Sequence, residues 1–209
     1  MRLTDSLEEQ ATLEAVLEAS KPALPESVRG LHYLLATPFR YRPRAGSRFR
    51  NAFAAGVWYG AEALRTALAE KSYWRLRFLL DSPGTPELKP VGHTAFRVRV
   101  RTRAALDLTR APFAAERSAW TSPVSYARTQ ALAVAARTAG IELIRYESVR
   151  DPGHAACAAV LSAKVFGRSQ PREQQEWFIA AGRERVRCAP AARAAGDSVE
   201  FSRAELAVA

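Results

Sequence analysis

The stretch from His93 to Val100 most constrains the fold, because apolar and charged residues alternate along it. Phe96, Val98 and Val100 are separated from one another by single arginines. A period of two places the apolar side chains on one face of a strand and the arginines on the other. No aromatic residues interleave with the arginines, so we expect a solvated sheet face here and not a stripe that binds nucleic acid.

Two short helices are expected before this strand. Residues 5–20 carry leucine and valine at roughly helical spacing, with Thr4 or Asp5 as the cap. A second helix fits residues 26–36 and is expected to end before Pro38, because the residue before a proline avoids the helical conformation. Residues beyond Pro38 contain further prolines and a turn, which predicts a loop.

Two longer helices separate the predicted strands. Residues 61–80 hold strong helix formers without a breaker, and a second helix is expected from Ser122 and Pro123 to the residue before Gly140. Further strands are expected at 57–60, 141–149, 155–161, 177–179 and 198–201. Helices come first and strands interrupted by two main helices follow, which predicts an α+β fold and not a doubly wound parallel sheet.

Length and composition describe an ordinary globular chain. It has 209 residues, 48% hydrophobic and 25% charged, which suits a single domain. The longest uncharged run, residues 152–163, is too short to span a membrane, and the first residues lack the apolar core of a signal peptide. Cys157 and Cys188 do not make a disulfide framework, so a cytoplasmic location is expected.

Positive charge is in excess and unevenly distributed. The net charge is +10, and 27 of the 31 basic residues are arginine, a skew that genome composition can also produce. Residues 1–30 sum to −3, so the remainder carries +13 and would attract anions such as phosphates, nucleotides, nucleic acid or an acidic partner. The acidic first helix could serve as a detachable arm, a dimer contact or surface cover.

Several common chemistries lack their motifs. His154 and Cys157 have the spacing of a ligand pair, but no second pair lies near, so no metal site is expected. The chain has no nucleophile elbow around a serine, no glycine-rich dinucleotide fingerprint and no Walker loop.

Residues 39–70 concentrate the side chains that could act on a dinucleotide. Tyr59 ends a predicted strand, and Glu70 lies among alanines on the following helix, either exposed or held in a cleft. Before them come Arg40, Arg42, Arg44, Arg48 and Arg50, with no acid among them. Arginine forks can hold a pyrophosphate, an aromatic ring can stack on nicotinamide, and a carboxylate can stabilise an oxocarbenium-like ribose.

At these residues the chain resembles the RES-domain family, named for its arginine, glutamate and serine. Ser148, at the end of a predicted strand, fits the serine, and Arg48, Tyr59 and Glu70 follow one another at intervals of 11 residues. The matching segments are Pro38-Phe39-Arg40-Tyr41, Gly46-Ser47-Arg48-Phe49, Val57-Trp58-Tyr59-Gly60 and Thr66-Ala67-Leu68-Ala69-Glu70.

The resemblance implies a compact fold similar to ADP-ribosyltransferase toxins, with mixed sheets, flanking helices and NAD bound in a cleft. Arg40 and Arg48 would bind phosphates, and Tyr41 and Tyr59 would line the nicotinamide and ribose pocket. Glu70 would stabilise the ribosyl cation, and Ser148 would hydrogen-bond in the same pocket. Arg42 and Arg44 are alternatives to Arg40, and Arg50 is an alternative to Arg48. Ser148 could instead form only a local backbone bond.

The same resemblance implies an NAD-degrading toxin of a bacterial toxin–antitoxin pair, which consumes NAD as substrate by phosphorolysis or hydrolysis. Inorganic phosphate would be a co-substrate in the first case, and no metal is implied. The implied partner is an antitoxin from a neighbouring gene, with nucleic acid contacted only through it. The implied division is a helical segment at 1–30 and a catalytic domain at 31–209. Alternatives are mono-ADP-ribosylation of a protein and a basic nucleic-acid-binding module.

Overall fold

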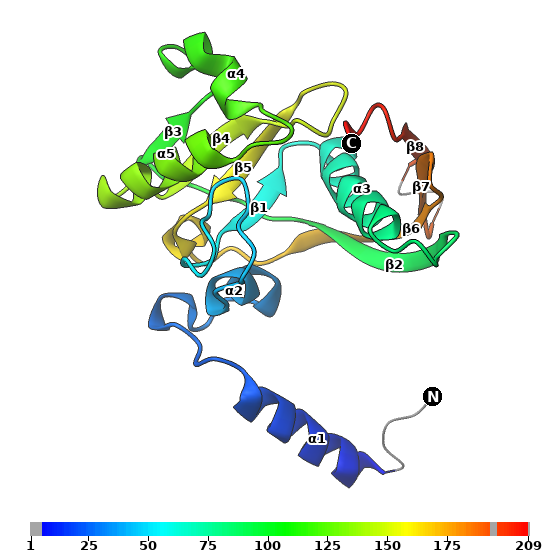
Figure 1. Cartoon of the computed structure of the whole chain (residues 1–209). Helices are drawn as coiled ribbons and strands as arrows, with labels where there is room; N and C mark the ends of the chain where they lie inside the picture. Colours follow the sequence, from blue (N-terminus) through cyan, green and yellow to red (C-terminus); the bar gives the residue numbers. More distant parts are fainter. Residues whose placement is uncertain (1–5, 193–195, 209) are drawn as a thin grey trace.

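The strands form two sheets in the computed structural model of this chain, which describes residues 6–192 and 196–208 (Figure 1). The first sheet has the order β1-β5-β4-β3, with strands Trp58–Ala61, Ala156–Val160, Leu143–Glu147 and Ala105–Asp107. The second has the order β2-β6-β7-β8, with strands Leu88–Arg97, Arg172–Ala181, Arg185–Pro190 and Val199–Ser202. The β3–β4 pair is parallel and the other pairs are antiparallel. The predicted α+β class is confirmed.

Each sheet has its own helix and its own core. Helix α3 (Leu64–Leu80) packs on the second sheet through residues such as Leu68 and Leu76. Helix α5 (Ala127–Thr138) packs on the first sheet through Ala133 and Ala136. A third core joins α2 (Tyr33–Arg40) to short 3₁₀ turns at Glu26–Val28 and Ala163–Phe166. The site described below therefore lies where separate cores meet.

Helix α3 follows the expected pattern of burial. Leu68, Ser72 and Leu76 are buried and recur every fourth residue, which directs one face of the helix into the core. Burying each leucine contributes roughly 1.5–3 kcal/mol, which is enough to fix the rotation of the helix. This rotation places Glu70 and Tyr73 on the flank of α3 that faces the first sheet.

Helix α2 departs from the prediction because it continues through Pro38 to Arg40. A proline inside a helix leaves the carbonyl four residues earlier without its usual donor, which here is the carbonyl of Leu34. Trp58 supplies the missing donor, since its Nε1 lies 3.3 Å from that oxygen. Gly56 permits this close packing, because a Cβ at that position would lie 1.7 Å from the carbonyl oxygen of Pro38. The predicted helix over 26–36 is wrong, and a tertiary contact is the reason.

Other boundaries moved for similar reasons. Helix α5 begins at Ala127, since the Ser122 hydroxyl accepts the amide of Ser125 in a turn and does not cap the helix. Its end before Gly140 is confirmed, with that glycine at φ +73°. Three elements were not predicted: β3, β7 and the short α4 (Arg117–Trp120), which follows a 3₁₀ turn at Phe113–Glu116.

Strand β2 begins and ends earlier than predicted, but its two faces are as expected. The chain leaves the sheet after Arg97, and Val98 and Val100 continue into the third core beside Phe96. The intervening arginines are exposed, and Arg97 pairs with Glu173 at 3.1 Å.

Helix α1 (Leu7–Ser20) projects from the rest of the molecule (Figure 1). None of its residues is buried, and Ser6 caps it by accepting the amide hydrogen of Glu9. The predicted caps Thr4 and Asp5 lie outside the described residues. An ion pair between Glu18 and Arg40, at 2.6 Å, ties the helix to α2. Among the described residues, no helix has the length and apolar character needed to cross a membrane.

Candidate active site

Glu70 and Ser148 meet between α3 and the end of β4. The hydroxyl of Ser148 donates to Oε1 of Glu70 at 2.7 Å. The hydroxyl oxygen of Ser148 in turn accepts the backbone amides of Arg150 and Asp151, at 3.2 and 3.0 Å. Because both lone pairs of the hydroxyl are occupied by amides, its proton is directed at the carboxylate. Ser148 therefore forms local backbone bonds and a bond to Glu70 at the same time, while its role toward NAD stays a prediction.

The surroundings of Glu70 disfavour its charged form relative to water. The side chain is largely withdrawn from water, and this desolvation raises the pKa of the carboxyl above its ordinary value. The hydrogen bond from Ser148 and the charges of Arg48 and Arg150 act in the opposite direction without cancelling the effect of burial on the pKa. A carboxylate held in this way is poorly solvated and would interact strongly with a cation that forms beside it.

Three residues on one flank of α3 fasten the segment 148–151, and we call this arrangement the clasp. Thr66 donates to Oδ2 of Asp151 at 2.7 Å, with both residues buried. One turn later, Glu70 accepts a hydrogen bond from Ser148. About one turn after that, the guanidinium of Arg150 lies over the ring of Tyr73, 3.6 Å from the ring centre. The clasp fixes the position of the carboxylate relative to the first sheet.

Arg150 extends the clasp to two other parts of the chain. Its guanidinium donates to the carbonyls of Ala207 and Pro123, each at 2.8 Å. The residue is 2% exposed, so these bonds form away from water and hold the C-terminal segment and the loop before α5 against the site. The sequence analysis missed Arg150, although a buried strand followed at once by a charged pair, Arg150 and Asp151, is the signal that could have indicated it.

Arg48 belongs to the same site. Its guanidinium donates to the carbonyls of Trp120 and Ser122, each at 3.0 Å, and lies 4.8 Å from the centre of the Tyr126 ring. These two bonds hold the fork in place and leave further N–H donors of the same guanidinium for an anion. The charge of Arg48 lowers the pKa of Glu70, so the two side chains are electrostatic neighbours.

Arg50 stabilises the loop that precedes β1. Its guanidinium donates to the carbonyls of Ala45, Pro43 and Asn51, at 2.7, 3.1 and 3.2 Å, and so closes the loop that carries Arg48. The geometry therefore favours Arg48 over Arg50 as the arginine that faces the carboxylate. Arg42 and Arg44 are exposed on the same loop.

Two tyrosines surround the group. The hydroxyl of Tyr59 bonds to Ser47 at 2.8 Å and accepts the amide of Phe49 at 3.0 Å, while its ring is partly exposed. Burial raises the pKa of Tyr59 and raises that of Tyr146 well above its ordinary value, so both stay neutral at physiological pH. Tyr146 interacts electrostatically with Glu70, Tyr59 and Arg48, which places these side chains in one neighbourhood. Tyr146 was also missed by the sequence analysis.

Arg40 and Tyr41 lie apart from this neighbourhood. Arg40 ends α2, where it pairs with Glu18 and donates from Nε to the carbonyl of Pro22 at 2.5 Å. Tyr41 follows as the C-terminal cap of α2 and is half-buried. Of the predicted site residues, the structure brings together Arg48, Tyr59, Glu70 and Ser148. The roles of Arg40 and Tyr41 toward NAD stay predictions.

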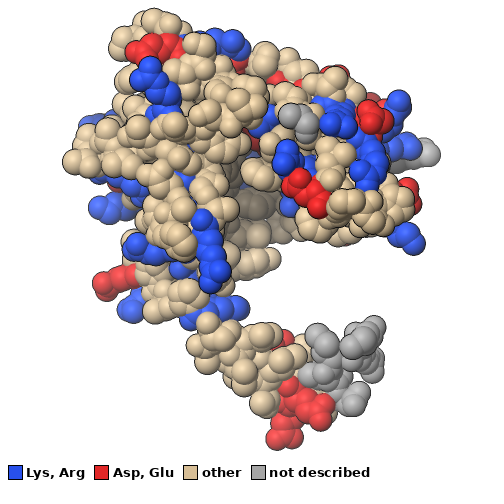
Figure 2. Space-filling view, in the orientation of Figure 1, with Lys and Arg blue, Asp and Glu red and all other residues tan. Residues whose placement is uncertain are grey.

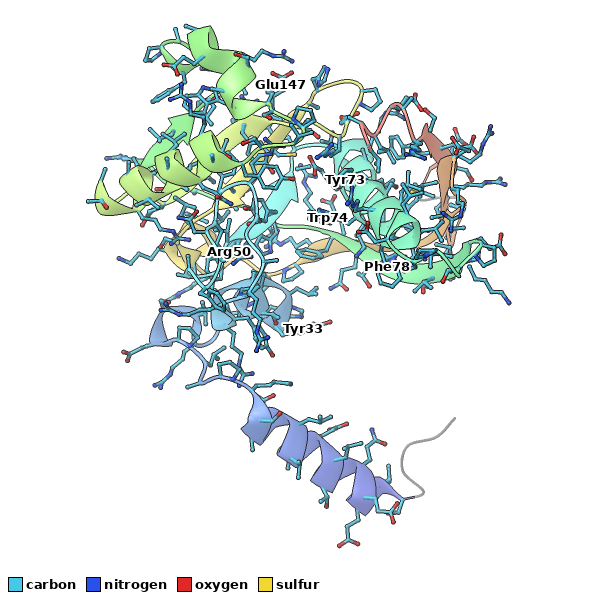
Figure 3. All side chains as sticks on the ribbon, viewed as in Figure 1. Tyr33, Arg50, Tyr73, Trp74, Phe78 and Glu147 are labelled. Carbon is cyan, nitrogen blue, oxygen red and sulfur yellow. The ribbon has the colours of Figure 1, made fainter. Side chains whose placement is uncertain are left out.

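The surface is hollowed next to this group. Figure 2 shows a depression between the part of the molecule that carries residues 41–57 and the part that carries α3. Figure 3 labels Tyr73 on the side of α3 nearer to β1, across from Arg50. The depression therefore adjoins the sheet and the helix that position Ser148 and Glu70.

His154 and Cys157, which have the sequence spacing of a ligand pair, lie in different environments. Burial raises the pKa of the Cys157 thiol to about 12, and its Sγ lies 4.0 Å from Oε1 of Glu70. His154 is exposed, and its Nδ1 lies 3.6 Å from Oε1 of Glu147. Within residues 6–192 and 196–208, no three side chains of histidine, cysteine, aspartate or glutamate gather as a metal site would require.

The chain is an α+β protein with two sheets. Its polar site, formed by Glu70, Ser148 and the buried Arg150, lies between the helix of the second sheet and the end of a strand of the first. The comparison with protein families then gives the identity: residues 24–180 match the model of the RES domain, and the chain belongs to the RES-domain family. This family is associated with NAD-related toxin activity, which indicates an enzyme that acts on NAD. No curated protein matches the sequence.

Proposed function

We propose that this chain cleaves the bond between nicotinamide and ribose in NAD and thereby depletes NAD. The observation that carries the proposal is the hydrogen-bonded pair of Glu70 and Ser148 beside Arg48. Nicotinamide would leave with the electron pair of the broken bond and become neutral, so no acid catalyst is needed for it. The positive charge would then reside on the ribose as an oxocarbenium-like centre.

Each residue of the site has a task in this reaction. The carboxylate of Glu70, fixed by the clasp, would stabilise the ribosyl cation and hold a ribose hydroxyl. Arg48 would bind the pyrophosphate with the donors that its backbone partners leave unused. The partly exposed ring of Tyr59 would line the nicotinamide pocket. An oxygen of phosphate or water would attack the ribose carbon, giving ADP-ribose phosphate or ADP-ribose and, from water, a proton.

The biological setting that we propose is a type II toxin–antitoxin pair. The support is membership of a family associated with NAD-related toxin activity, together with the positive charge of the chain. An antitoxin with an acidic segment would suit the exposed arginines of the loop beside the depression.

Incubation of the purified chain with NAD, with and without phosphate, tests the proposal when products are identified by mass. We expect nicotinamide in both cases, with ADP-ribose phosphate appearing only when phosphate is present. NAD that stays intact in both would contradict the proposal. ADP-ribose attached to a protein would assign the same site to mono-ADP-ribosylation, and cleavage that survives Glu70→Gln would remove the site assignment.

A further inference from the structure

The opposite flank of α3 carries a groove that the proposed reaction does not use. It lies between α3 and the start of β2 and has a volume of about 370 Å³. Three cations line it: Lys71, Arg75 and Lys89. Among its lining residues in the described chain there is no carboxylate, and we call it the α3–β2 groove.

The cations in this groove form no ion pair with any of the residues that the structure describes. Lys71 and Arg75 repel each other and are partly withdrawn from water, and both effects lower the pKa of Lys71. The pKa of neighbouring His93 is lowered by burial and by the same two cations. Arg75 Nε and His93 Nε2 are buried without a hydrogen-bond partner in the described residues. Buried polar atoms normally have a hydrogen-bond partner, so the polar groups behind the groove are incompletely satisfied within the described residues.

Apolar side chains are exposed in the same groove. Phe78 is 63% exposed, Trp74 is 53% exposed and Val91 is 49% exposed (Figure 3 labels the two aromatic residues). Large apolar side chains gathered at a surface mark an interaction site. The groove therefore fits a partner that is both acidic and apolar.

Helix α1 has this chemistry. It contains four glutamates and neither lysine nor arginine. Glu8 and Glu14 form no ion pair in the described chain, and Leu7 and Leu17 are 85% and 51% exposed. Leu13, Val16 and Leu17 follow the i, i+3, i+4 spacing of one helix face, with Glu14 beside them. The helix also precedes residues 24–180, so it is an addition to the family domain.

We propose that two copies of this chain associate by exchange of α1, with the helix of each copy seated in the α3–β2 groove of the other. Within one chain, α1 and α3 lie apart (Figure 1), so the helix does not cover its own groove. Opposite charge and exposed apolar surface are matched on the two sides. A reciprocal contact between identical copies closes with two-fold symmetry, which limits assembly to a dimer. The proposal does not depend on the cleavage of NAD.

The test is the mass of the full-length chain in solution, measured by sedimentation or light scattering over the micromolar range. We expect twice the 23.0 kDa mass of the chain. The helix variant Glu8→Lys/Glu14→Lys and the groove variant Lys71→Glu/Lys89→Glu should each have the mass of one chain. The matched controls Glu116→Lys and Lys164→Glu reverse exposed charges elsewhere and should stay dimeric.

Mixing the two charge-reversed variants gives the sharper result. The helix of one variant, with lysines at positions 8 and 14, meets the groove of the other, with glutamates at positions 71 and 89, and the acidic helix of the second meets the basic groove of the first. We expect the mixture to recover the dimer mass although neither variant forms it alone.

A wild-type chain that stays monomeric, reversed variants that stay dimeric, or a mixture that fails to associate would each overturn the proposal. A single-stranded oligonucleotide that binds monomeric wild type and not the groove variant would assign the groove to nucleic acid instead.

Discussion

The two flanks of α3 differ in whether their polar and charged side chains have partners in the fold. On the flank that faces the first sheet, Thr66, Glu70 and Tyr73 each contact a partner in the segment 148–151. On the flank that faces β2, Lys71 and Arg75 stand together beside apolar side chains without an acid. A site for chemistry has to be rigid before substrate arrives, whereas a docking surface is completed by its partner.

The largest effect is expected from Glu70→Gln. Loss of the charge that stabilises the transition state should lower the rate of NAD cleavage by roughly 10²–10³-fold or more. The amide keeps the shape of the side chain, so the chain should fold. Glu62→Gln is the matched control, since Glu62 lies just before α3 and pairs with Arg145 outside the site. Equal rates for the two variants would contradict the assignment.

The same substitution should change the pH dependence of stability. Burial raises the pKa of Glu70 in the folded chain, so the folded state holds this proton more tightly than the unfolded state does. Stability from this group is therefore present at low pH and lost as pH rises through the raised pKa. The melting temperature of Glu70→Gln relative to wild type should therefore rise as the pH increases from the ordinary pKa of a glutamate carboxyl, 4.5, through the raised pKa of Glu70.

Arg150→Ala should give the next largest effect, on stability. It leaves buried carbonyls without a donor and removes the cation from the Tyr73 ring, so we expect a loss of about 2–4 kcal/mol in the free energy of unfolding. Urea denaturation measures it. The control Arg97→Ala removes an exposed ion pair and should cost about 1 kcal/mol or less. Similar costs would show that the clasp does not stabilise the fold.

Ser148→Ala should have a smaller effect on rate and a diagnostic effect on pH dependence. The serine lowers the pKa of Glu70, so its loss should move the acidic limb of NAD cleavage to higher pH. A hydrogen bond to a charged group contributes about 1.5–3 kcal/mol, which corresponds to roughly ten- to a hundredfold in rate at a fixed pH. Ser72→Ala, which removes a buried hydroxyl bonded to Cys188, is the control and should leave the limb in place.

The smallest effect on stability is expected from Phe78→Ser on the other flank. The side chain is exposed, so the free energy of unfolding should change by no more than about 0.5 kcal/mol when measured in dilute solution. Self-association should weaken at the same time. A large loss of stability would instead make this aromatic residue part of the core.

Local composition was sufficient to predict α3, β1 and β5, because helix formers without a breaker and short apolar runs favour these elements wherever they lie in the fold. The helix through Pro38 could not be predicted, since Trp58 supplies its missing hydrogen bond from another element. Arg150 could not be assigned a role for the same reason: its partners lie in segments distant in sequence. Choosing Arg48 over Arg50 also needed the structure, because the two differ only in which carbonyls they reach.

By itself the sequence determined the class of fold, the exposure of the arginines that alternate with Phe96, Val98 and Val100, and the Arg–Tyr–Glu–Ser set that marks the family. These depend on periodicity and on residue identity, which are local properties. Only the tertiary structure decided which carbonyls Arg48 and Arg50 reach, that the Ser148 hydroxyl bonds backbone and carboxylate together, and that Lys71 and Arg75 lie together in the α3–β2 groove. Those outcomes depend on packing between elements far apart in the chain, where burial and not sequence spacing determines the strength of each polar contact.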